Sequence, residues 1–308
     1  MRSRSTMPQP APPTERRNPR TTGIDTLDPE AALRLLLDED ARAVEAARAA
    51  TGPLARAVEE THVRLARGGG VHYFGAGASG RLAVLDATEI TPTFGVAPGL
   101  FTAHFAGGPG ALTDASVDRE DAEELGAADA AGAELGENSV AIGITASGTT
   151  PYVAGALRAA RAAGALTVLI TCDPGAPLRE SAEIVVVADT GEEALTGSTR
   201  LKAGTATKVL LNAFSTALMI KAGRTYSNLM VGLVATNAKL RTRAVSLLVE
   251  ATGEDAAVCR DALAEAGGRI PEALVRLLTG CPPDRARAAL AAHPGVRAAV
   301  AALGGQAG

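Results

Sequence analysis

Two glycine- and serine-rich loops, each set between a β-prone run and a helical pattern, constrain the fold of this 308-residue chain more than any other feature. The first loop, residues 75–80, follows the β-prone run 71–74 and precedes a helical pattern at 81–86. The second loop, residues 146–151, follows the buried-type run 139–145, and a helix is predicted after it. A strand that enters a loop and then a helix is the repeating unit of a parallel sheet.

The same alternation continues downstream of the second loop. Residues 166–172 and 183–188 are expected to form two further strands, and residues 201–222 a long helix. Strands that alternate with helices predict the α/β class, with a doubly wound, flavodoxin-like parallel sheet covered on both faces. Ligands of such sheets bind beyond the carboxyl ends of the strands, which is where both loops fall.

Helical segments are predicted ahead of the first strand. Residues 1–16 are rich in Pro, Ser and Arg, so we expect them to be disordered. A helix is predicted to begin after Asp28, with Asp28 as its cap and Pro29 in its first turn. Further helices are expected at about 40–50 and about 53–67.

Short helical patterns near the end of the chain predict a small separate module. They cover about 254–266, 271–279 and 283–291. The boundaries that we expect are a disordered N-terminus at 1–16, an N-terminal helical segment at 17–54, a ligand-binding domain at 55–228, a helical connection at 229–252 and a C-terminal helical module at 253–308.

Net charge, cysteine spacing and the lack of long apolar runs exclude several classes of partner and of site. The formal net charge of −4 argues against nucleic acid, because binding to its phosphates requires a basic surface. The three cysteines (Cys172, Cys259 and Cys281) have neither CxxC spacing nor a nearby histidine, so neither a disulfide framework nor a metal site is expected. No apolar segment follows the basic N-terminus, and no run reaches the roughly 18 apolar residues of a membrane span. We therefore expect a cytoplasmic protein that binds neither nucleic acid nor membrane.

The first loop also matches a dinucleotide-binding motif. Gly75, Gly77 and Gly80 fit GxGxxG, and the strand and helix stand in the required order. A dinucleotide-binding fold carries an acidic residue about 20 residues further on, at the end of its second strand, to bind the ribose. The corresponding run, residues 100–108, has no acidic residue at its end, so the motif does not indicate NAD binding.

A phosphate site explains both loops better. Each loop contains a Ser-Gly step, Ser79-Gly80 in the first and Ser147-Gly148 in the second. Glycine lets a ligand approach the backbone, and free N–H groups at a helix start, with small hydroxyls beside them, suit a phosphate monoester. One such loop is equally typical of a tight turn with a hydroxyl cap. Two in one α/β domain favour phosphate binding.

Four separated blocks of the sequence carry a resemblance to a known family. They are residues 74–89, 144–153, 195–208 and 228–241. These blocks resemble the N-acetylmuramic acid 6-phosphate etherases, which belong to the sugar isomerase (SIS) domain group. The segment 14–32 and the ending, with its ubiquitin-associated-like helical module, are also similar, so the resemblance covers about residues 14–300.

The resemblance implies a reaction, a substrate and an assembly. The substrate is a sugar phosphate, no cofactor or metal is needed, and a homodimer with sites near the subunit interface is expected. The family removes D-lactate from C3 of the sugar and leaves N-acetylglucosamine 6-phosphate. Ring opening makes the C2 proton acidic; a base takes it, an acid assists the departure of lactate, and water then adds at C3.

The resemblance also assigns residues. It places the family's two catalytic glutamates at Glu89 and Glu120. We assign Glu89 as the proton donor to the departing lactate and Glu120 as the C2 base, although the sequence alone leaves open which of the two is the acid. The residues expected to hold the 6-phosphate are Ser79, Gly80, Ser147, Gly148, Thr149 and Thr150, and weaker candidates near the sugar are Ser198 and Lys202. Without the resemblance, these three residues have simpler interpretations. Glu120 lies in an acidic run that is typical of a solvated helix face. Glu89 could be a charge at a helix end, and Lys202 a surface charge. A non-catalytic sugar-phosphate sensor and an aldose–ketose isomerase on the same fold are the alternative functions.

Three places depart from the family's pattern. Ile90 and Thr91 stand where the family usually has Cys-Pro, Thr149 where it usually has Arg, and Gly232 where it usually has Asp. The change at Thr149 removes one charged contact. We therefore expect substrate affinity or specificity to differ from the family's, but not the fold.

Overall fold

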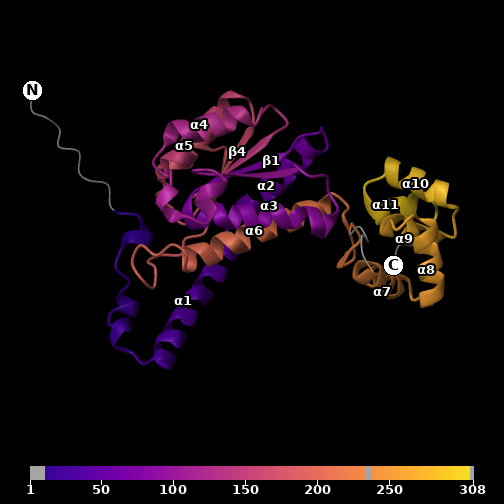
Figure 1. The fold of residues 1–308 in the computed structure, drawn as a ribbon, viewed down its shortest axis with the longest axis horizontal. Coiled ribbons are helices and arrows are strands. Elements are labelled where there is room, and N and C mark those ends of the chain that lie inside the picture. Colours follow the sequence, from indigo (N-terminus) through magenta and orange to yellow (C-terminus); the bar gives the residue numbers. More distant parts are fainter. Residues whose placement is uncertain (1–10, 233–237, 306–308) are drawn as a thin grey trace, which may run out of the picture. The chain divides into compact units, whose positions relative to one another are not determined.

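The computed structural model describes residues 11–232 and 238–305, and it contains a five-stranded parallel sheet (Figure 1). The strand order is β2-β1-β3-β4-β5, and every neighbouring pair is parallel. This order reverses between β1 and β3, as in flavodoxin-like sheets. The predicted α/β class with a doubly wound parallel sheet is confirmed. The strands are β1 (Val71–Gly75), β2 (Phe101–Phe105), β3 (Val140–Ile144), β4 (Leu166–Thr171) and β5 (Ile184–Val187).

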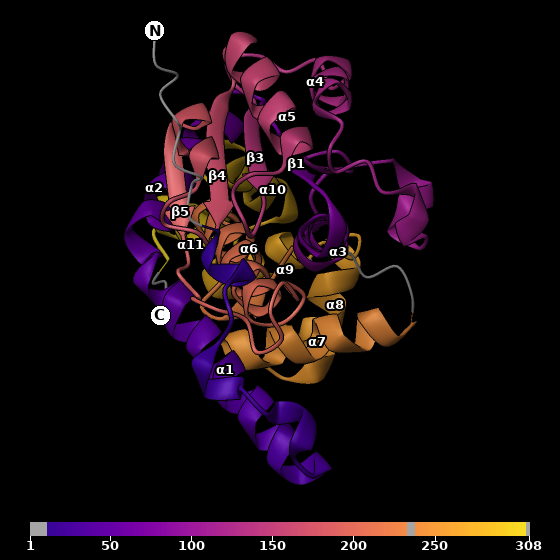
Figure 2. The ribbon, with the colours of Figure 1, turned by 90° about the vertical axis from the view of Figure 1, so that its left-hand side faces the viewer.

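Helices cover both faces of the sheet, which explains why two of its inner strands are buried throughout. All residues of β3 and β4 are buried. Helices α4 (Glu123–Gly132) and α5 (Pro151–Ala162) lie on one face, and α2 (Thr51–Leu65), α3 (Gly77–Phe94) and α6 (Lys202–Lys221) lie on the other (Figures 1 and 2).

The N-terminal region is more ordered than its composition suggests. Residues 1–10 of the predicted disordered segment lie outside the described residues, but Pro13–Glu15 form a 3₁₀-helix in which Pro13 and Thr14 are buried. Two further 3₁₀-helices, Pro19–Thr21 and Ile24–Thr26, lead to α1 (Pro29–Ala49).

Helix α1 begins as predicted but runs further. The Asp28 carboxylate accepts a hydrogen bond from the Ala31 N–H at 2.9 Å, so the expected cap is present. The two helices expected up to residue 50 are one continuous helix, since no Gly or Pro interrupts the chain between 30 and 49.

Helix α3 is also longer than the predicted helical pattern at residues 81–86. It continues through Pro92 to Phe94 and therefore contains Glu89. The helix ends where Gly95 adopts a left-handed conformation (φ +61°) and donates its N–H to the Thr91 carbonyl at 2.9 Å. The stop signal is thus Gly95, which lies beyond the proline.

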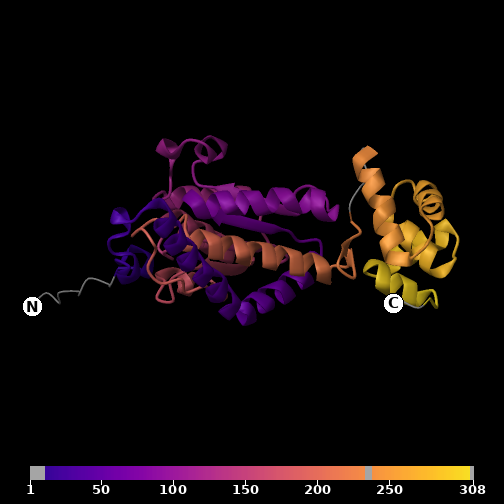
Figure 3. The same cartoon turned by 90° about the horizontal axis from the view of Figure 1, so that it is seen from below.

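Contacts divide the chain into two compact units, residues 1–86 with 101–214, and residues 87–100 with 215–308. The second unit holds a short antiparallel pair and the C-terminal helices, which are orange and yellow in Figure 3. These helices share one apolar core with Tyr226 and Val231. Within the described residues, no helix is long and apolar enough to cross a membrane. The elements are β6 (Thr225–Tyr226), β7 (Leu229–Met230), α7 (Ala238–Thr252), α8 (Ala256–Glu265), α9 (Ile270–Thr279), α10 (Pro283–Ala292) and α11 (Gly295–Ala302).

The C-terminal module contains one helix more than the three predicted. Helices α8, α9 and α10 match the expected patterns within a few residues, and α11 follows them. Helix α7, placed in the connection by sequence, packs in the same apolar core through Ala244, Leu247 and Leu248. Helix α11 is only eight residues long and begins directly after Pro294 with Gly295, a dipeptide typical of a turn, so local pattern did not predict it.

Candidate functional site

A cavity of about 230 Å³ lies at the carboxyl ends of β1 and β3, at the point where the strand order reverses. The first loop lines it with residues 76–79 and the second with residues 144–147 and Thr150. Ser79 and Ser147, which sequence assigned to one phosphate site, therefore line the same cavity. The remaining lining residues are Glu15, Glu120, Gly197 and Thr199.

The first loop brings the start of α3 close to β1. A Cβ on Gly75 would lie 2.9 Å from the Gly80 Cα, and a Cβ on Gly80 would lie 2.6 Å from the Gly75 carbonyl oxygen. The Gly80 N–H donates to the Ala76 carbonyl at 2.9 Å. Gly80, which was assigned to the phosphate site, is buried and lies outside the cavity lining, so the structure gives it a packing role. The helix begins at Gly77, and its first N–H groups have no intrahelical acceptor, which suits an anion.

A chain of hydroxyl groups forms the second loop. The Thr150 hydroxyl donates to the Glu120 carboxylate at 3.2 Å, so its single proton is engaged there. The hydroxyls of Thr145 and Thr150 are 2.8 Å apart, and Thr145 is therefore the donor. Thr145 in turn accepts the Gly148 N–H at 3.2 Å. This chain orients polar groups toward one carboxylate at the cavity wall.

The second loop depends on glycine at position 148. Gly148 has a left-handed backbone (φ +68°), and a Cβ there would lie 2.1 Å from the Ala176 Cβ. Gly148 is buried and outside the cavity lining, so it shapes the loop rather than facing a ligand. Thr149 is exposed next to it, and its hydroxyl lies 2.9 Å from the Ser147 hydroxyl.

Glu120 is the carboxyl that the structure joins to both loops. It lies on the connection from β2 to α4; its backbone carbonyl accepts the Tyr152 N–H at 3.0 Å, and its own N–H donates to Asp118. Its side chain keeps a solvent-exposed surface, yet the protein around the carboxyl desolvates it and raises its pKa. The hydrogen bond from Thr150 opposes that rise, and the charges of Asp118 and Asp121 add to it. A raised pKa suits a general base, which is most effective near the working pH.

The predicted catalytic Glu89 lies elsewhere on α3. Its side chain is exposed and, among the described residues, it is not part of the cavity lining. Helix α3 is continuous from Gly77 to Phe94, so the ten steps along the chain from Ser79 to Glu89 correspond to about 15 Å along its axis. The structure thus brings Glu120 to the Ser79 and Ser147 loops, whereas Glu89 belongs to the second compact unit.

Lys202, a weaker candidate for the sugar, is not at the cavity either. Its side chain is 0% exposed, and its ammonium group donates to the Glu39 carboxylate at 2.5 Å. Arg20 and Asn18 also donate to Glu39, and the hydrogen bond from Arg20 contributes most to lowering the pKa of Glu39 to about 2. Lys202 is therefore neither a surface charge nor part of the cavity lining; it is a buried partner of Glu39. Ser198 is half-buried, and its neighbours Gly197 and Thr199 line the cavity in its place.

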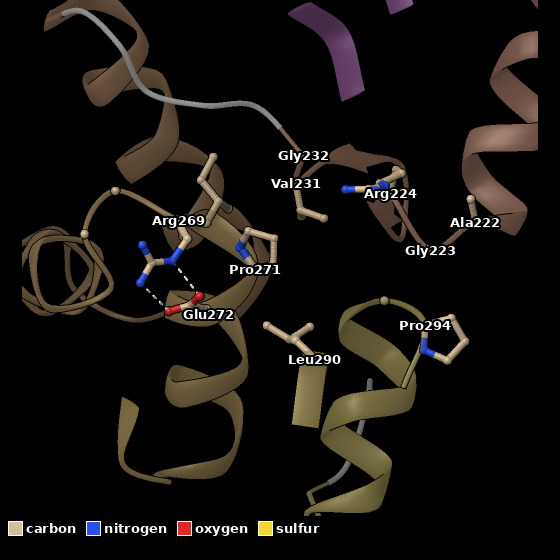
Figure 4. A pocket seen from close by; sticks show the side chains of 14 residues that line it. Ala222, Gly223, Arg224, Val231, Gly232, Arg269, Pro271, Glu272, Leu290 and Pro294 are labelled. Carbon is tan, nitrogen blue, oxygen red and sulfur yellow. Dashed lines mark hydrogen bonds and ion pairs between the residues drawn. The ribbon is translucent and has the colours of Figure 1, made fainter. Parts of the chain in front are cut away.

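A larger pocket of about 420 Å³ lies within the C-terminal unit (Figure 4). Its polar side chains include Arg269 and Glu272, which pair with each other at 2.5 Å. Gly232, one of the departures from the family's pattern, lines it, and a Cβ there would lie 2.1 Å from the Phe94 carbonyl oxygen. This pocket has no hydroxyl loop like those at the sheet, so the cavity at β1 and β3 is the better candidate site. The described residues contain no cluster of three or more His, Cys, Asp or Glu that could hold a metal ion.

Comparisons with known proteins agree with this fold. The chain matches the glucokinase regulatory protein N-terminal SIS domain over residues 53–161 and the SIS domain over residues 117–217. It is 53% identical to an N-acetylmuramic acid 6-phosphate etherase of Thermobifida fusca over 267 residues, which are 87% of each chain. It is 45% identical to the etherase of Salmonella agona over 287 residues, which are 93% of this chain and 97% of that one.

The chain belongs to the N-acetylmuramic acid 6-phosphate etherase family. The resemblance drawn from four sequence blocks is confirmed. Among solved structures, a phosphoheptose isomerase from Francisella tularensis covers 63% of this chain and 100% of its own, with a TM-score of 0.52 at 16% identity. That likeness shows the fold alone.

Proposed function

We propose that this protein cleaves the lactyl ether of N-acetylmuramic acid 6-phosphate as a carbon–oxygen lyase, giving D-lactate and N-acetylglucosamine 6-phosphate. Membership of the etherase family supports the substrate. The observation that carries the chemistry is Glu120, whose carboxyl lies in one cavity with the Ser79 and Ser147 loops and accepts the Thr150 hydrogen bond. Hydroxyls and helix-start N–H groups bind the phosphoryl group, and Glu120 takes the C2 proton.

We further propose that the protein acts as a homodimer and that Glu89 protonates the lactate leaving from the partner's site. Glu89 is exposed, and about 15 Å of helix separate it from Ser79, which is longer than the reach of a sugar ring held at that loop. A second copy of the chain can bring this carboxyl to the substrate. We also place the protein in the cytoplasm, because a charged sugar phosphate does not cross a lipid bilayer unaided.

The first experiment tests the reaction. The purified protein is incubated with N-acetylmuramic acid 6-phosphate, and released D-lactate is measured. Glu120→Gln should lose about 10²-fold or more of the turnover rate, because general acid–base catalysis contributes that much, while binding of N-acetylglucosamine 6-phosphate persists. Glu45→Gln, at an exposed position of α1, is the control. A folded protein that binds the sugar phosphate but releases no lactate would support the sensor, and a ketose product without lactate would support the isomerase.

The second experiment tests the shared site. Glu89→Gln and Glu120→Gln subunits are mixed, exchanged and assayed together. If each site uses Glu89 from one subunit and Glu120 from the other, every mixed dimer has one intact site. Random exchange makes half of the dimers mixed, so activity should return to about a quarter of the wild-type level. No recovery in demonstrably mixed dimers would place both glutamates of a site in one chain.

A further inference from the structure

The N-terminal segment contributes a second carboxylate to the phosphate-binding cavity. Glu15 lines it together with Gly197 and Thr199, on residues far from both loops in sequence. Its carboxylate lies against Gly197, where a Cβ would come within 3.0 Å of the Glu15 Oε2. The reaction proposed above assigns no role to this residue.

This segment is tied to the loop before α6 at several points. The Gly197 N–H donates to the Thr14 carbonyl at 2.9 Å, immediately next to Glu15. Further along, the Thr21 hydroxyl donates to the Ala194 carbonyl at 2.8 Å, and the Asn18 amide to the Glu192 carbonyl at 3.3 Å. Glu15 is therefore held at the cavity by its backbone neighbours and is not the end of a loose tail.

The charge of Glu15 decides what it can contact. A phosphoryl group carries close to two negative charges near pH 7 and would be repelled by a carboxylate. The phosphate therefore lies at the Ser79 and Ser147 loops, and a carboxylate, which only accepts hydrogen bonds, faces the donors of the same ligand. Those donors are the hydroxyl and amide N–H groups of an amino-sugar phosphate.

We propose that Glu15 is a substrate-binding residue whose carboxylate accepts a hydrogen bond from a sugar hydroxyl or from the amide N–H of the N-acetyl group. This inference rests on the sugar-phosphate site of the proposed function, and it adds a residue from outside the two loops. Glu15 distinguishes the sugar from a bare phosphate, while the loops bind the phosphoryl group that the two ligands share.

The test is calorimetric binding of two probes, N-acetylglucosamine 6-phosphate and inorganic phosphate. Glu15→Ala should raise the dissociation constant of the sugar phosphate about tenfold or more, since a hydrogen bond to a charged group is lost. It should leave inorganic phosphate binding unchanged or tighter, because a nearby negative charge is removed. Glu15→Gln retains a hydrogen-bond acceptor and should weaken sugar-phosphate binding less than Glu15→Ala does. Glu45→Gln should change the dissociation constant of neither probe.

Two results would overturn the inference: no change in sugar-phosphate binding, or an equal loss for both probes in a variant that unfolds at the wild-type temperature. Binding does not require turnover, so this outcome is separate from the lactate assay. A wild-type protein that releases no lactate, but binds the sugar phosphate in a Glu15-dependent way, would defeat the proposed reaction and retain Glu15 as a binding residue.

Discussion

Replacing Glu39 by glutamine should destabilise the first unit strongly, because it removes the negative charge that pairs with a buried lysine. The Glu39 residue is 2% exposed and Lys202 is 0% exposed, with 2.5 Å between the carboxylate and the ammonium group. Arg20 also donates to this carboxylate but is partly exposed and can turn toward water. Lys202 cannot, so the variant leaves a buried ammonium group without a counter-ion.

The structure allows the size of the loss to be worked out. The pKa of Glu39 falls from 4.5 to about 2, mainly through the hydrogen bond from Arg20 and further through those from Lys202 and Asn18. At about 1.4 kcal/mol for each pH unit, this corresponds to about 3 kcal/mol of folding free energy at pH 7. Breaking a buried ion pair from one side costs about 3–5 kcal/mol in other proteins, which is consistent.

The pH dependence has a definite sign. Because folding lowers the pKa of Glu39, its contribution is fully present above about pH 4.5 and disappears as the pH falls toward 2. The gap in stability between the wild type and Glu39→Gln should therefore be widest at neutral pH and should shrink between pH 4.5 and 2. At pH 7, the melting temperature of this unit should fall by roughly 6–12 °C.

Urea unfolding followed by circular dichroism at pH 7, 4.5 and 3 measures these differences. Glu45→Gln is the matched control, since Glu45 lies on the same helix with its side chain 69% exposed, and it should lose less than about 1 kcal/mol. The double change Glu39→Leu with Lys202→Met should recover much of the loss, because no charge is then left buried. The reasoning is refuted if Glu39→Gln loses no more than the control, or if its deficit is the same at every pH.

Three further changes test the site. Thr150→Val removes the donor that lowers the pKa of Glu120, so the acidic limb of the pH–rate profile for lactate release should move to higher pH. Gly148→Ala forces a left-handed backbone on alanine and a clash with Ala176, and should cost about 2 kcal/mol or more of folding free energy by urea unfolding. Thr149→Arg adds the cation that the family usually has and should tighten sugar-phosphate binding several-fold in calorimetry, less so at high salt.

Each of these changes has a control and a contrary outcome. Thr149→Val is the control and should not move the pH–rate profile. An unmoved profile in Thr150→Val would show that the Thr150 hydroxyl does not influence the pKa of Glu120. Gly110→Ala meets open space and should be tolerated, so equal losses at both glycines would contradict the steric account. Thr51→Arg adds the same charge at an exposed position of α2. An equal gain in affinity in that variant would show that the effect of Thr149→Arg comes from the net charge of the protein and not from a local contact.

Local pattern was sufficient to predict the sheet and the meeting of the two loops. β-Prone runs followed by loops with Ser-Gly steps identified β1 and β3 as strands of one parallel sheet, and parallel strands present their carboxyl ends at one edge. Ser79 and Ser147 therefore had to lie close together. Thr145 was missed, although a hydroxyl on the last residue before a Ser-Gly loop was the available signal.

Long-range contacts were beyond the reach of local pattern. Lys202 looked like a site or surface residue because its partner Glu39 stands 163 positions earlier in the chain. Glu15 lies in a stretch whose Pro and Arg content predicted disorder, and its segment is held by tertiary contacts with residues 192–197, Gly197 among them. Gly80 showed a phosphate-loop pattern, but the close approach of α3 to β1 is what requires a glycine there.

The position of Glu15 has a practical consequence for anyone who produces this protein. A purification tag fused directly ahead of Ala11 would be separated by only four residues from Glu15, whose side chain lines the cavity. Bulky or cationic tags, polyhistidine included, would then compete with the anionic sugar for that space. A tag fused after Gly308, or one removed by protease before the assay, avoids this competition. The measured affinity for the sugar phosphate is then that of the protein alone.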